Sequence, residues 1–452
     1  KFQDGSVKCI EDEIPFELPE GWAWCRLNSI VDVRDGTHDT PTYVDKGIPL
    51  ITSKNLVEGG IDYSNVKYIS EKDAISINDR SGVNIGDILF AMIGTIGNPS
   101  MVTEDILISI KNVALFKFTF SKNLSNHFVM YFLDYAQEDM KNKPSGGLQP
   151  FVSLNFLRTY LVPVPPVEEQ QRIVSILADS INKIRNIDVL KNELTASVKK
   201  AKSKILDLAI RGKLVPQDPN DEPASVLLER IRVEKEELIK QGKIKRDKKE
   251  SIIFRGDDNS YYEKIGDDIE NIDTEIPFNL PDNWIWCRGC SCFSGMETTK
   301  PQGEFFDYID IDSIDNRLHC IKKTKRIPVI EAPSRASRAI NSGSVLFSLV
   351  RPYLENIALI EEIHSHSIAS TGFYVCNSNG LLLPDYMFYL MISKYVVDGL
   401  NQYMKGDNSP SISRNDIENW LYPIPPIDEQ RRICYILKTT FATIEKLEES
   451  LI

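Results

Sequence analysis

The longest regular pattern of apolar and polar positions lies in the middle of the chain. Residues 168–211 contain neither Gly nor Pro, and Gly212 follows, where glycine favours the left-handed conformation that ends a helix. The pattern predicts one helix over 168–211, about 66 Å long at 1.5 Å per residue. Ten steps along its apolar seam cover 35 residues, a mean of 3.5, which is the period of a coiled coil. A partner helix is therefore expected.

A second seam of the same kind begins at Ile433 and runs to Leu451, close to the last residue. We expect the two seams to pair as an antiparallel coiled coil. The seam positions are Ile173, Leu177, Ile181, Ile184, Ile187, Leu190, Leu194, Val198, Ala201, Ile205 and Leu208 in the first helix and Ile433, Leu437, Phe441, Ile444, Leu447 and Leu451 in the second. A further helix is expected over 223–241, with Pro223 in its first turn and Gly242 at its end.

The remaining segments are mainly strand-like. Residues 22–27 and 113–120 are rich in β-branched and aromatic residues, and Gly, Asn and Asp separate such runs. One helix is expected over 126–141 from the spacing of its aromatic residues, with a counterpart over 384–400. These patterns predict an α+β fold with two tandem sheet-containing domains joined by long helices.

Two motifs occur twice. Glu13–Arg26 is echoed by Glu275–Arg288 at ten of fourteen positions, and Pro163–Leu177 by Pro423–Leu437 at nine of fifteen. The offsets of 262 and 260 residues indicate a tandem duplication. We therefore expect a domain at 1–166, a central helical region at 167–255, a second domain at 256–426 and a distal helix at 427–452.

Between these motifs the two copies share only fragments, such as Gly86–Phe90 against Gly343–Phe347. A kept framework with different interiors is typical of two modules that read different targets on one scaffold. Plain divergence after an old duplication is the alternative, because fold and function separate easily.

Composition restricts the function classes further. The chain has 452 residues with a net charge of -12 and a pI near 5.2, which argues against a strongly basic nucleic-acid surface over the whole protein. No apolar run reaches the roughly 20 residues of a membrane span, so a cytoplasmic protein without a membrane partner is expected. Eight scattered Cys residues are expected to be reduced thiols.

Motifs for catalysis or metal binding are absent or weak. No Gly-x4-Gly-Lys-Ser/Thr loop for nucleotide phosphates occurs, and neither proline pair has the flanking residues of a methyltransferase motif. Cys287, Cys290 and Cys292 permit a zinc hypothesis, but we favour cysteines on a buried strand because no second pair follows at suitable spacing. His364 and His366 are expected in a surface turn. The basic run 243–249 is expected to be a solvated linker, with phosphate contact as the alternative.

The block Leu206–Ile231 resembles specificity subunits of type I restriction-modification enzymes. So does the Pro-x-Pro-Pro-x-Glu-x-Gln motif at Pro163, which occurs again at Pro423 with Asp428 in place of Glu. The resemblance covers the whole layout of recognition domain, long helix, recognition domain and long helix. It implies a non-catalytic subunit that binds double-stranded DNA and assembles with two modification subunits and with restriction subunits. It also implies no cofactor in this chain, because S-adenosylmethionine, ATP and Mg would be used by the partner subunits.

Compared with that family, the distal helix ends early at Ile452, and Lys1–Phe2 resembles Lys264–Ile265. We therefore expect segments beyond both ends of this sequence. From the residues alone, a coiled-coil scaffold with paired protein-binding domains is the alternative function. It would lack clustered Arg, Lys and Asn side chains on its domain faces.

Candidate base readers are chosen by side-chain chemistry, since Arg and Lys suit guanine and Asn and Gln suit adenine. Each domain is expected to enter the major groove at its own half-site, and the helices fix the unread gap between the half-sites. The candidates are Thr37, His38, Lys54, Asn55, Arg80, Lys141, Lys143, Ser145 and Gln149 in the first domain, and Lys300, Gln302, Arg335, Arg338, Arg351, Tyr353, Lys405, Asn408, Ser409 and Arg414 in the second.

Overall fold

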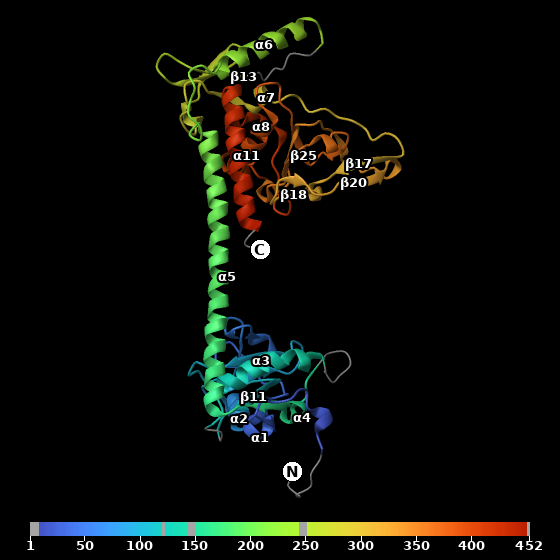
Figure 1. The fold of residues 1–452 in the computed structure, drawn as a ribbon. Helices are drawn as coiled ribbons and strands as arrows, with labels where there is room; N and C mark the ends of the chain where they lie inside the picture. Colours follow the sequence, from blue (N-terminus) through green and yellow to red (C-terminus); the bar gives the residue numbers. More distant parts are fainter. Residues whose placement is uncertain (1–8, 120–122, 143–150, 244–250, 450–452) are drawn as a thin grey trace. The chain divides into compact units, whose positions relative to one another are not determined.

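The computed structural model describes residues 9–119, 123–142, 151–243 and 251–449. The chain divides into two compact units, Lys1–Asp188 and Val189–Ile452, and helix α5 (Val167–Ile210) begins in the first and ends in the second (Figure 1). The repeats instead place the end of the first domain at residue 166, where α5 starts. Within the described ranges, no helix combines the length and the apolarity that crossing a membrane requires.

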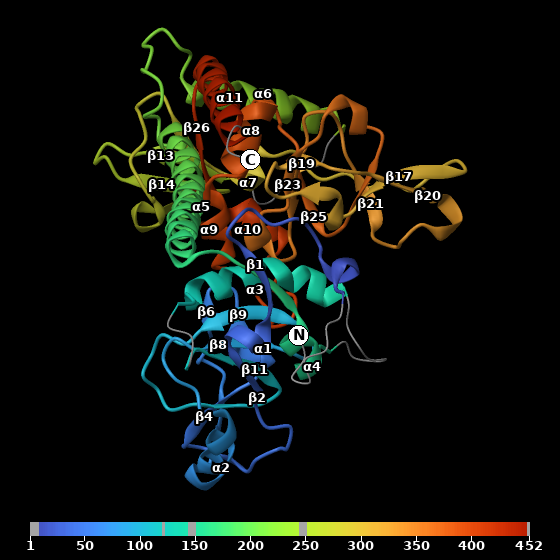
Figure 2. The same cartoon turned by 60° about the horizontal axis from the view of Figure 1, so that its bottom comes forward.

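The first unit contains an antiparallel four-stranded sheet, which lies beside helix α3 (Asn126–Asn142) in Figure 2. Its strand order is β2 (Asp32–Asp35), β11 (Val113–Lys117), β8 (Ile88–Ala91) and β9 (Gly97–Met101). Phe90 and Phe116 from the sheet and Val129 and Leu133 from α3 belong to one buried cluster. This cluster is the core that supports the rest of the unit.

A second sheet of the first unit carries the polar loops. Its order is β10 (Ser109–Ile110), β4 (Ile48–Ile51), β7 (Lys67–Ile69) and β3 (Tyr43–Val44). Strands β10 and β4 are parallel, and β4 and β7 are antiparallel. Between β4 and β7 the chain makes the short turn η2 (Ser53–Asn55) and the hairpin of β5 (Leu56–Val57) and β6 (Gly60–Ile61).

The second unit repeats the central strands of both sheets even though its sequence differs between the two motifs. One sheet has the order β23 (Ile357–Leu359), β22 (Val345–Ser348) and β25 (Phe373–Cys376), and the other has the order β20 (Lys325–Pro328), β17 (Phe305–Ile309), β24 (Ile368–Ser370) and β21 (Ala336–Ala339). Strand β17 is parallel to β24 and antiparallel to β20. The turn η4 (Ile311–Ser313) and the hairpin of β18 (Ile314–Asp315) and β19 (Cys320–Ile321) follow β17.

The two repeated motifs meet in space within each unit. Strand β1 (Ala23–Arg26) pairs with β12 (Leu161–Val164), and β16 (Ile285–Arg288) pairs with β26 (Leu421–Ile424). Trp24 lies opposite Pro163 and Trp286 opposite Pro423. The entry and exit of each domain thus form one antiparallel ladder, which explains why these two segments stayed similar while the interiors diverged.

The remaining helices include α2 (Glu71–Ser81), α4 (Leu154–Thr159), α6 (Ala224–Lys240), α10 (Arg414–Asn419) and α11 (Ile427–Glu449). The expectation of one helix over 384–400 is wrong. The chain forms α8 (Pro384–Met391) and α9 (Lys394–Asn401), because the Ser393 hydroxyl accepts a hydrogen bond from Val396 N and starts a new helix. Likewise, the strand expected over 22–27 ends at Arg26, and Leu27 begins the short helix α1 (Leu27–Ile30).

Residues 251–255, which the sequence places in the central helical region, form strand β13 (Ser251–Arg255). It belongs to a three-stranded sheet with β14 (Tyr261–Ile265) and β15 (Asp268–Asn271). Most of the basic run 243–249 lies outside the described residues.

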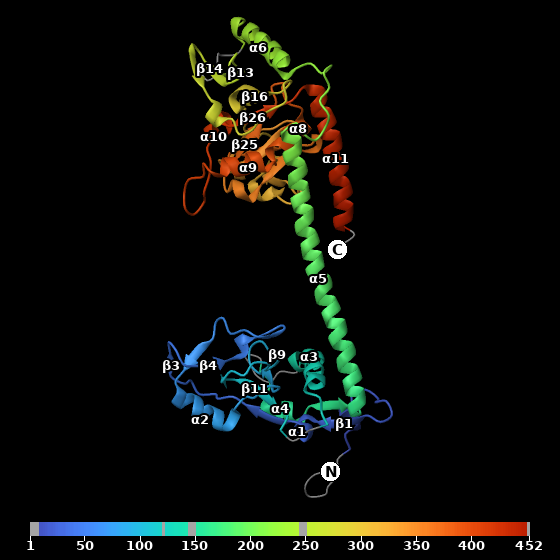
Figure 3. The same cartoon turned by 90° about the vertical axis from the view of Figure 1, so that its left-hand side faces the viewer.

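The end of α5 and helix α11 pack together in the second unit (Figure 3). Leu206 and Ile210 share a buried cluster with Ile433 and Leu437, and Lys202 Nζ lies 2.7 Å from Glu448 Oε2. Lys202 precedes Leu206 in α5 and Glu448 follows Leu437 in α11, so the two helices run antiparallel over this stretch.

Candidate nucleic-acid interface

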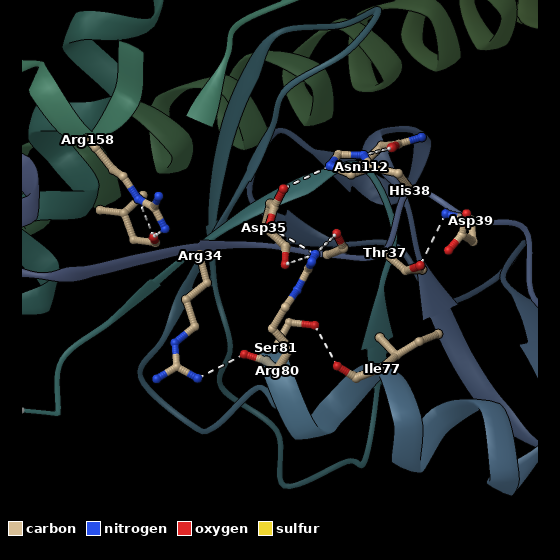
Figure 4. Close-up of polar contacts among 12 residues, drawn as sticks. Arg34, Asp35, Thr37, His38, Asp39, Ile77, Arg80, Ser81, Asn112 and Arg158 are labelled. Atoms are coloured by element: carbon tan, nitrogen blue, oxygen red, sulfur yellow. Dashed lines mark hydrogen bonds and ion pairs between the residues drawn. The ribbon is translucent and has the colours of Figure 1, made fainter. Parts of the chain in front are cut away.

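A polar loop follows strand β2 in the first unit and lies against the end of α2 (Figure 4). Helix α2 starts at Ser70, whose hydroxyl accepts a hydrogen bond from Asp73 N. Its residues Ala74 and Ile77 pack against Leu50 and Ile69 of the second sheet. This packing fixes the direction of the helix and brings its last turn to the loop of residues 36–42.

Arg80 is held at this loop by its guanidinium group. Its Nη2 atom lies 3.0 Å from Asp35 Oδ1 and 2.9 Å from the carbonyl oxygen of Gly36 (Figure 4). The side chain is still 62% exposed. Arg34 Nη1 donates to the carbonyl oxygen of Arg80 at 2.9 Å, which places a second guanidinium group nearby. Arg80 is therefore oriented and accessible at the same time.

His38 lies on the other side of Asp35. Its Nε2 atom is 2.8 Å from Asp35 Oδ2 and its Nδ1 atom is 2.9 Å from Asn112 Oδ1. Hydrogen bonding to Asn112 and to Asp35 raises the pKa of His38 above its usual value. Because both ring nitrogens face acceptor oxygens, the doubly protonated imidazolium satisfies both contacts.

Neighbouring residues complete this first polar surface. The Thr37 hydroxyl accepts a hydrogen bond from Asp39 N, and Lys111 Nζ donates to the Thr40 hydroxyl at 2.6 Å. Arginine, imidazolium and lysine groups donate to phosphate oxygens and to guanine, whereas a carboxylate accepts from the amino group of cytosine. The surface thus has the mixed donors and acceptors that base reading needs, with less positive charge than non-specific phosphate binding favours.

The second unit builds the corresponding surface from a different element. Between β20 and β22 it has the turn η5 (Val329–Glu331) and strand β21, where the first unit has α2 between β7 and β8. Thr298 bridges to Arg338 of β21, and Thr299 N donates to Ser337 O at 3.0 Å. The exposed residues Lys300 and Gln302 continue from this segment.

Arg338 of β21 lies within the electrostatic influence of a second arginine, Arg414. Burial and the charge of Arg414 lower the pKa of Arg338, and Arg338 Nε has no hydrogen-bond partner among the described residues. Arg414 Nε donates to Glu418 Oε1 at 2.5 Å. Arg335, at the start of the same segment, lies 3.6 Å from Asp310 Oδ2 and is mostly exposed. Since Arg414 and Arg335 face carboxylates, Arg338 Nε is the donor of this group that lacks a partner among the described residues, and an acceptor of a ligand could fill that place.

A second group of candidates meets around Arg351. Its main-chain N donates to Pro410 O at 2.7 Å, and its Nη2 atom donates to Asn408 O at 2.9 Å. Lys405 and Ser411 exchange two main-chain hydrogen bonds of 3.0 Å, which closes the loop. The loop that carries Lys405, Asn408 and Ser409 is thus fixed to Arg351, and Tyr353 nearby is 46% exposed.

Asn55 does not fit the role of base reader. Its side chain is buried and accepts hydrogen bonds from Thr52 N and Thr52 Oγ1, which form a capping box at η2. Ser313 makes the equivalent capping contact with Asp310 in the second unit. Lys54 beside Asn55 is exposed, and Lys141 pairs with Glu138. Lys143, Ser145 and Gln149 lie outside the described residues.

The candidates from the sequence did not include four residues that contribute to the first surface: Arg34, Asp35, Lys111 and Asn112. Lys111 and Asn112 form the tight turn between β10 and β11, and Asn112 has a φ of 55°. A polar Lys-Asn pair between two apolar runs is a turn signal that was available in the sequence. Arg34 lies within β2, and no sequence signal marks it.

The cysteines were the candidates for a zinc site. Within the described part of the chain, no group of three or more His, Cys, Asp or Glu residues has the arrangement to hold a metal ion. Cys287 is on β16, as expected for a buried strand, but Cys290 and Cys292 lie on the short helix α7 (Gly289–Cys292), so the strand interpretation is wrong for these two. His364 ends the turn η7 (Glu362–His364) and His366 is exposed.

Comparisons with known proteins agree on one family. Residues 19–196 match the sequence model of the type I restriction modification DNA specificity domain. The specificity subunit of the type I restriction enzyme EcoAI from Escherichia coli is 27% identical, over 97% of this chain and 80% of the relative. The EcoEI specificity subunit from Escherichia coli is 23% identical, over 100% of this chain and 83% of the relative.

A similar solved structure comes from work on complex assembly and conformational transition of the type I R-M system. The two chains superpose with a TM-score of 0.60 at 18% identity, covering 97% of this chain and 94% of the other. This likeness concerns the fold.

Proposed function

We propose that the chain is a specificity subunit of a type I restriction-modification enzyme, as the matched family model and relatives support, and that it reads a bipartite, asymmetric DNA target with one half-site for each domain. The first reading surface comprises the loop of residues 36–42 with Arg80, His38 and Lys111. The second comprises β21, the segment carrying Lys300 and Gln302, and the loop fixed to Arg351.

One observation carries this proposal. Both units share the strand orders β11-β8-β9 and β10-β4-β7, which correspond to β25-β22-β23 and β24-β17-β20. The element beside the polar loop is nevertheless an 11-residue helix in the first unit and a turn plus a strand in the second. A fold that is kept while its exposed polar element changes presents two different donor and acceptor patterns. Two different patterns match two different base sequences, so the target is asymmetric.

The long helices supply the spacing in this proposal. Ile184, Ile187 and Leu190 in the middle of α5 are each 60% or more exposed, although they continue the apolar seam. A seam of this period is stable when a second helix covers it. We propose an antiparallel coiled coil that fixes the length of the unread gap between the half-sites.

The chemistry belongs to other subunits in this proposal. Modification subunits use S-adenosylmethionine to methylate the DNA, and restriction subunits use ATP and Mg to translocate and cut it. The net charge of -12 supports a division of labour in which the partner subunits provide much of the phosphate affinity. The specificity subunit then provides the base contacts and the spacing.

The test is co-expression of this chain with its modification subunit, followed by mapping of methylated bases on a random DNA library. The expected result is a split motif whose two halves have a fixed separation. A complex that includes Arg80→Ala is the matched comparison, because only one half of the motif should become less selective. Methylation at a continuous motif would contradict the proposal. So would a motif that is the same in the Arg80→Ala complex as in the unaltered complex.

A further inference from the structure

Each unit fastens its domain to the start of a long helix with the same three residues, which we call the clamp. In the first unit Trp22 Nε1 donates to Glu169 Oε2 at 3.1 Å, and in the second Trp284 Nε1 donates to Glu429 Oε2 at 2.9 Å. The Trp directly precedes a β strand, and the Glu lies in the first turn of α5 or α11. The clamp is completed by Gln170 and Gln430.

The two glutamines make closely matching contacts. Gln170 Oε1 accepts from Ser125 N at 2.8 Å, and its Nε2 atom donates to Asn123 O at 3.3 Å and Pro165 O at 3.0 Å. Gln430 Oε1 accepts from Leu383 N at 2.7 Å, and its Nε2 atom donates to Leu381 O at 2.9 Å and Pro425 O at 3.0 Å. Both side chains are almost completely buried.

These contacts connect two helices of different roles. Ser125 and Leu383 directly precede α3 and α8, the helices at the start of the carboxyl-terminal half of each domain. Pro165 and Pro425 lie two residues before the long helices. One buried amide therefore holds the start of the domain helix against the start of the long helix. A buried amide that loses its hydrogen-bond partners is destabilising, so the joint has one preferred geometry.

We infer that the clamp residues are positioning residues, which set the direction in which each domain projects from its helix and thereby the number of base pairs between the two half-sites. This inference rests on the proposed function. A domain of about 160 residues is roughly 40 Å across, so a tilt of about 5° at the joint moves its far side by about 3.4 Å, which is one base-pair step.

The two clamps differ in one respect. In the second unit Gln217 Nε2 also donates to Glu429 Oε1 at 2.6 Å, and Arg432 forms a two-pronged ion pair with Asp221. The segment between α5 and α6 thus braces this joint. Arg172 stands at the position of Arg432 in the first unit, and the described residues provide it with no ion-pair partner. The first clamp depends more on Gln170 alone.

The test measures gap preference in the complex of the full chain with its modification subunit. The probes are DNA duplexes that carry the two mapped half-sites with gaps from two base pairs shorter to two longer. We compare Gln170→Ala with Gln171→Ala, a glutamine on the same helical turn whose side chain is exposed. The expected result is that Gln170→Ala reduces the preference for the best gap over its neighbours by about tenfold, while the bases read in each half-site stay the same.

Gln430→Ala should have a smaller effect than Gln170→Ala, because the contacts of Gln217 with Glu429 and of Arg432 with Asp221 remain. If Gln170→Ala does not assemble, Trp22→Phe decides, since it keeps an aromatic ring and removes only the donor to Glu169. Glu169→Gln is the conservative control: it keeps an oxygen that accepts the indole hydrogen bond, so this variant should retain the sharp gap preference of the unaltered complex. If Gln170→Ala and Trp22→Phe unfold at a lower temperature but keep the gap preference, the inference about the clamp is wrong and the proposed function is unaffected. No fixed gap in the unaltered complex would overturn the proposed function.

Discussion

Arg80 Nη2 lies 3.0 Å from Asp35 Oδ1, so a carboxylate of strand β2 holds the guanidinium group in place while most of the arginine side chain stays exposed. The same carboxylate contacts His38 through its other oxygen. Asp35 thus fixes two cationic side chains on one surface. An arginine held in advance loses less conformational entropy when it binds a base.

Replacing Arg80 should therefore affect sequence selectivity and affinity together. We expect Arg80→Ala to weaken binding of the complex to its target by about 1–3 kcal/mol and to relax the bases of one half-site. The measurement is affinity for duplexes with single-base changes in each half-site. Lys72→Ala removes a positive charge from the first turn of the same helix and is the control. Equal losses for all sequences would show that Arg80 contacts only phosphate.

Arg338 should act on the opposite half of the target. Its Nε atom lacks a hydrogen-bond partner among the described residues, and Arg414 lies near enough to lower its pKa along with burial. We expect Arg338→Ala to relax bases only in the half-site that Arg80→Ala leaves unchanged, with a cost of about 1–3 kcal/mol. Methylation mapping on a random library distinguishes the two patterns. Overlap of the affected positions would refute the assignment of one domain to each half-site.

His38 predicts a pH dependence. Its pKa is raised because the protonated ring donates to Asn112 and Asp35, so this stabilising contribution is complete below the ordinary pKa of histidine and is lost as pH rises through the raised value. DNA affinity should fall over the same window by up to about fivefold, since a screened surface charge contributes at most about 1 kcal/mol. Titration from pH 6 to 9 at constant salt measures it. A His38→Gln complex with the same pH profile would exclude His38 as the cause.

A buried ion pair holds β8 to β11 in the first unit. Lys117 Nζ lies 2.8 Å from Asp87 Oδ2 and also donates to Gly82 O, and both side chains are buried. Ser344 and Asn377 take these positions in the second unit and form a hydrogen bond instead. We expect Lys117→Met to lower the free energy of unfolding by about 3–5 kcal/mol, because a charge stays buried without its partner.

The double variant Asp87→Ser with Lys117→Asn is the matched control for this pair. It transplants the neutral contact of the second unit and should cost less than Lys117→Met alone. Denaturant unfolding followed by a probe in the first unit provides the comparison, because two units need not unfold together. A double variant as unstable as the single one would show that the contact depends on surroundings that the two units do not share.

The long helix should determine the gap length. Inserting seven residues between Val189 and Val198 keeps the heptad phase and adds about 10.5 Å of helix, or about three base pairs. We expect the preferred gap to lengthen while both half-sites keep their bases. Mapping the methylated motif of the insertion variant tests this, with a variant carrying seven replaced exposed residues as the control. Altered half-site bases would refute the spacer role.

The sequence predicted the long helix and the strand content because these depend on local periodicity. Residues 168–211 were expected to be helical, and α5 covers Val167–Ile210. The break between α8 and α9 was missed because the aromatic spacing of 384–400 continues through it, although Ser393 in that stretch is a common helix start. Here a single side-chain hydrogen bond outweighs the apolar pattern.

The reading surface was harder to predict because its members come from separate strands. Thr37, His38 and Arg80 were candidates by chemistry, but Asp35, Asn112 and Lys111 join them only through the pairing of β2 with β11. Asn55 had suitable chemistry and is buried in a capping box instead. Side-chain chemistry in a sequence therefore gives the right kinds of residue, and only the strand order shows which of them share a surface.

The insertion between β7 and β8, or between β20 and β22, is where the scaffold accepts a helix in one unit and a strand in the other. The paired strands β4 with β10, and β17 with β24, form their hydrogen bonds without help from this element. Under the proposed function, replacing helix α2 (residues 71–81) by another element would change the DNA sequence that the first unit reads. The two clamps and the long helix α5 would stay unchanged.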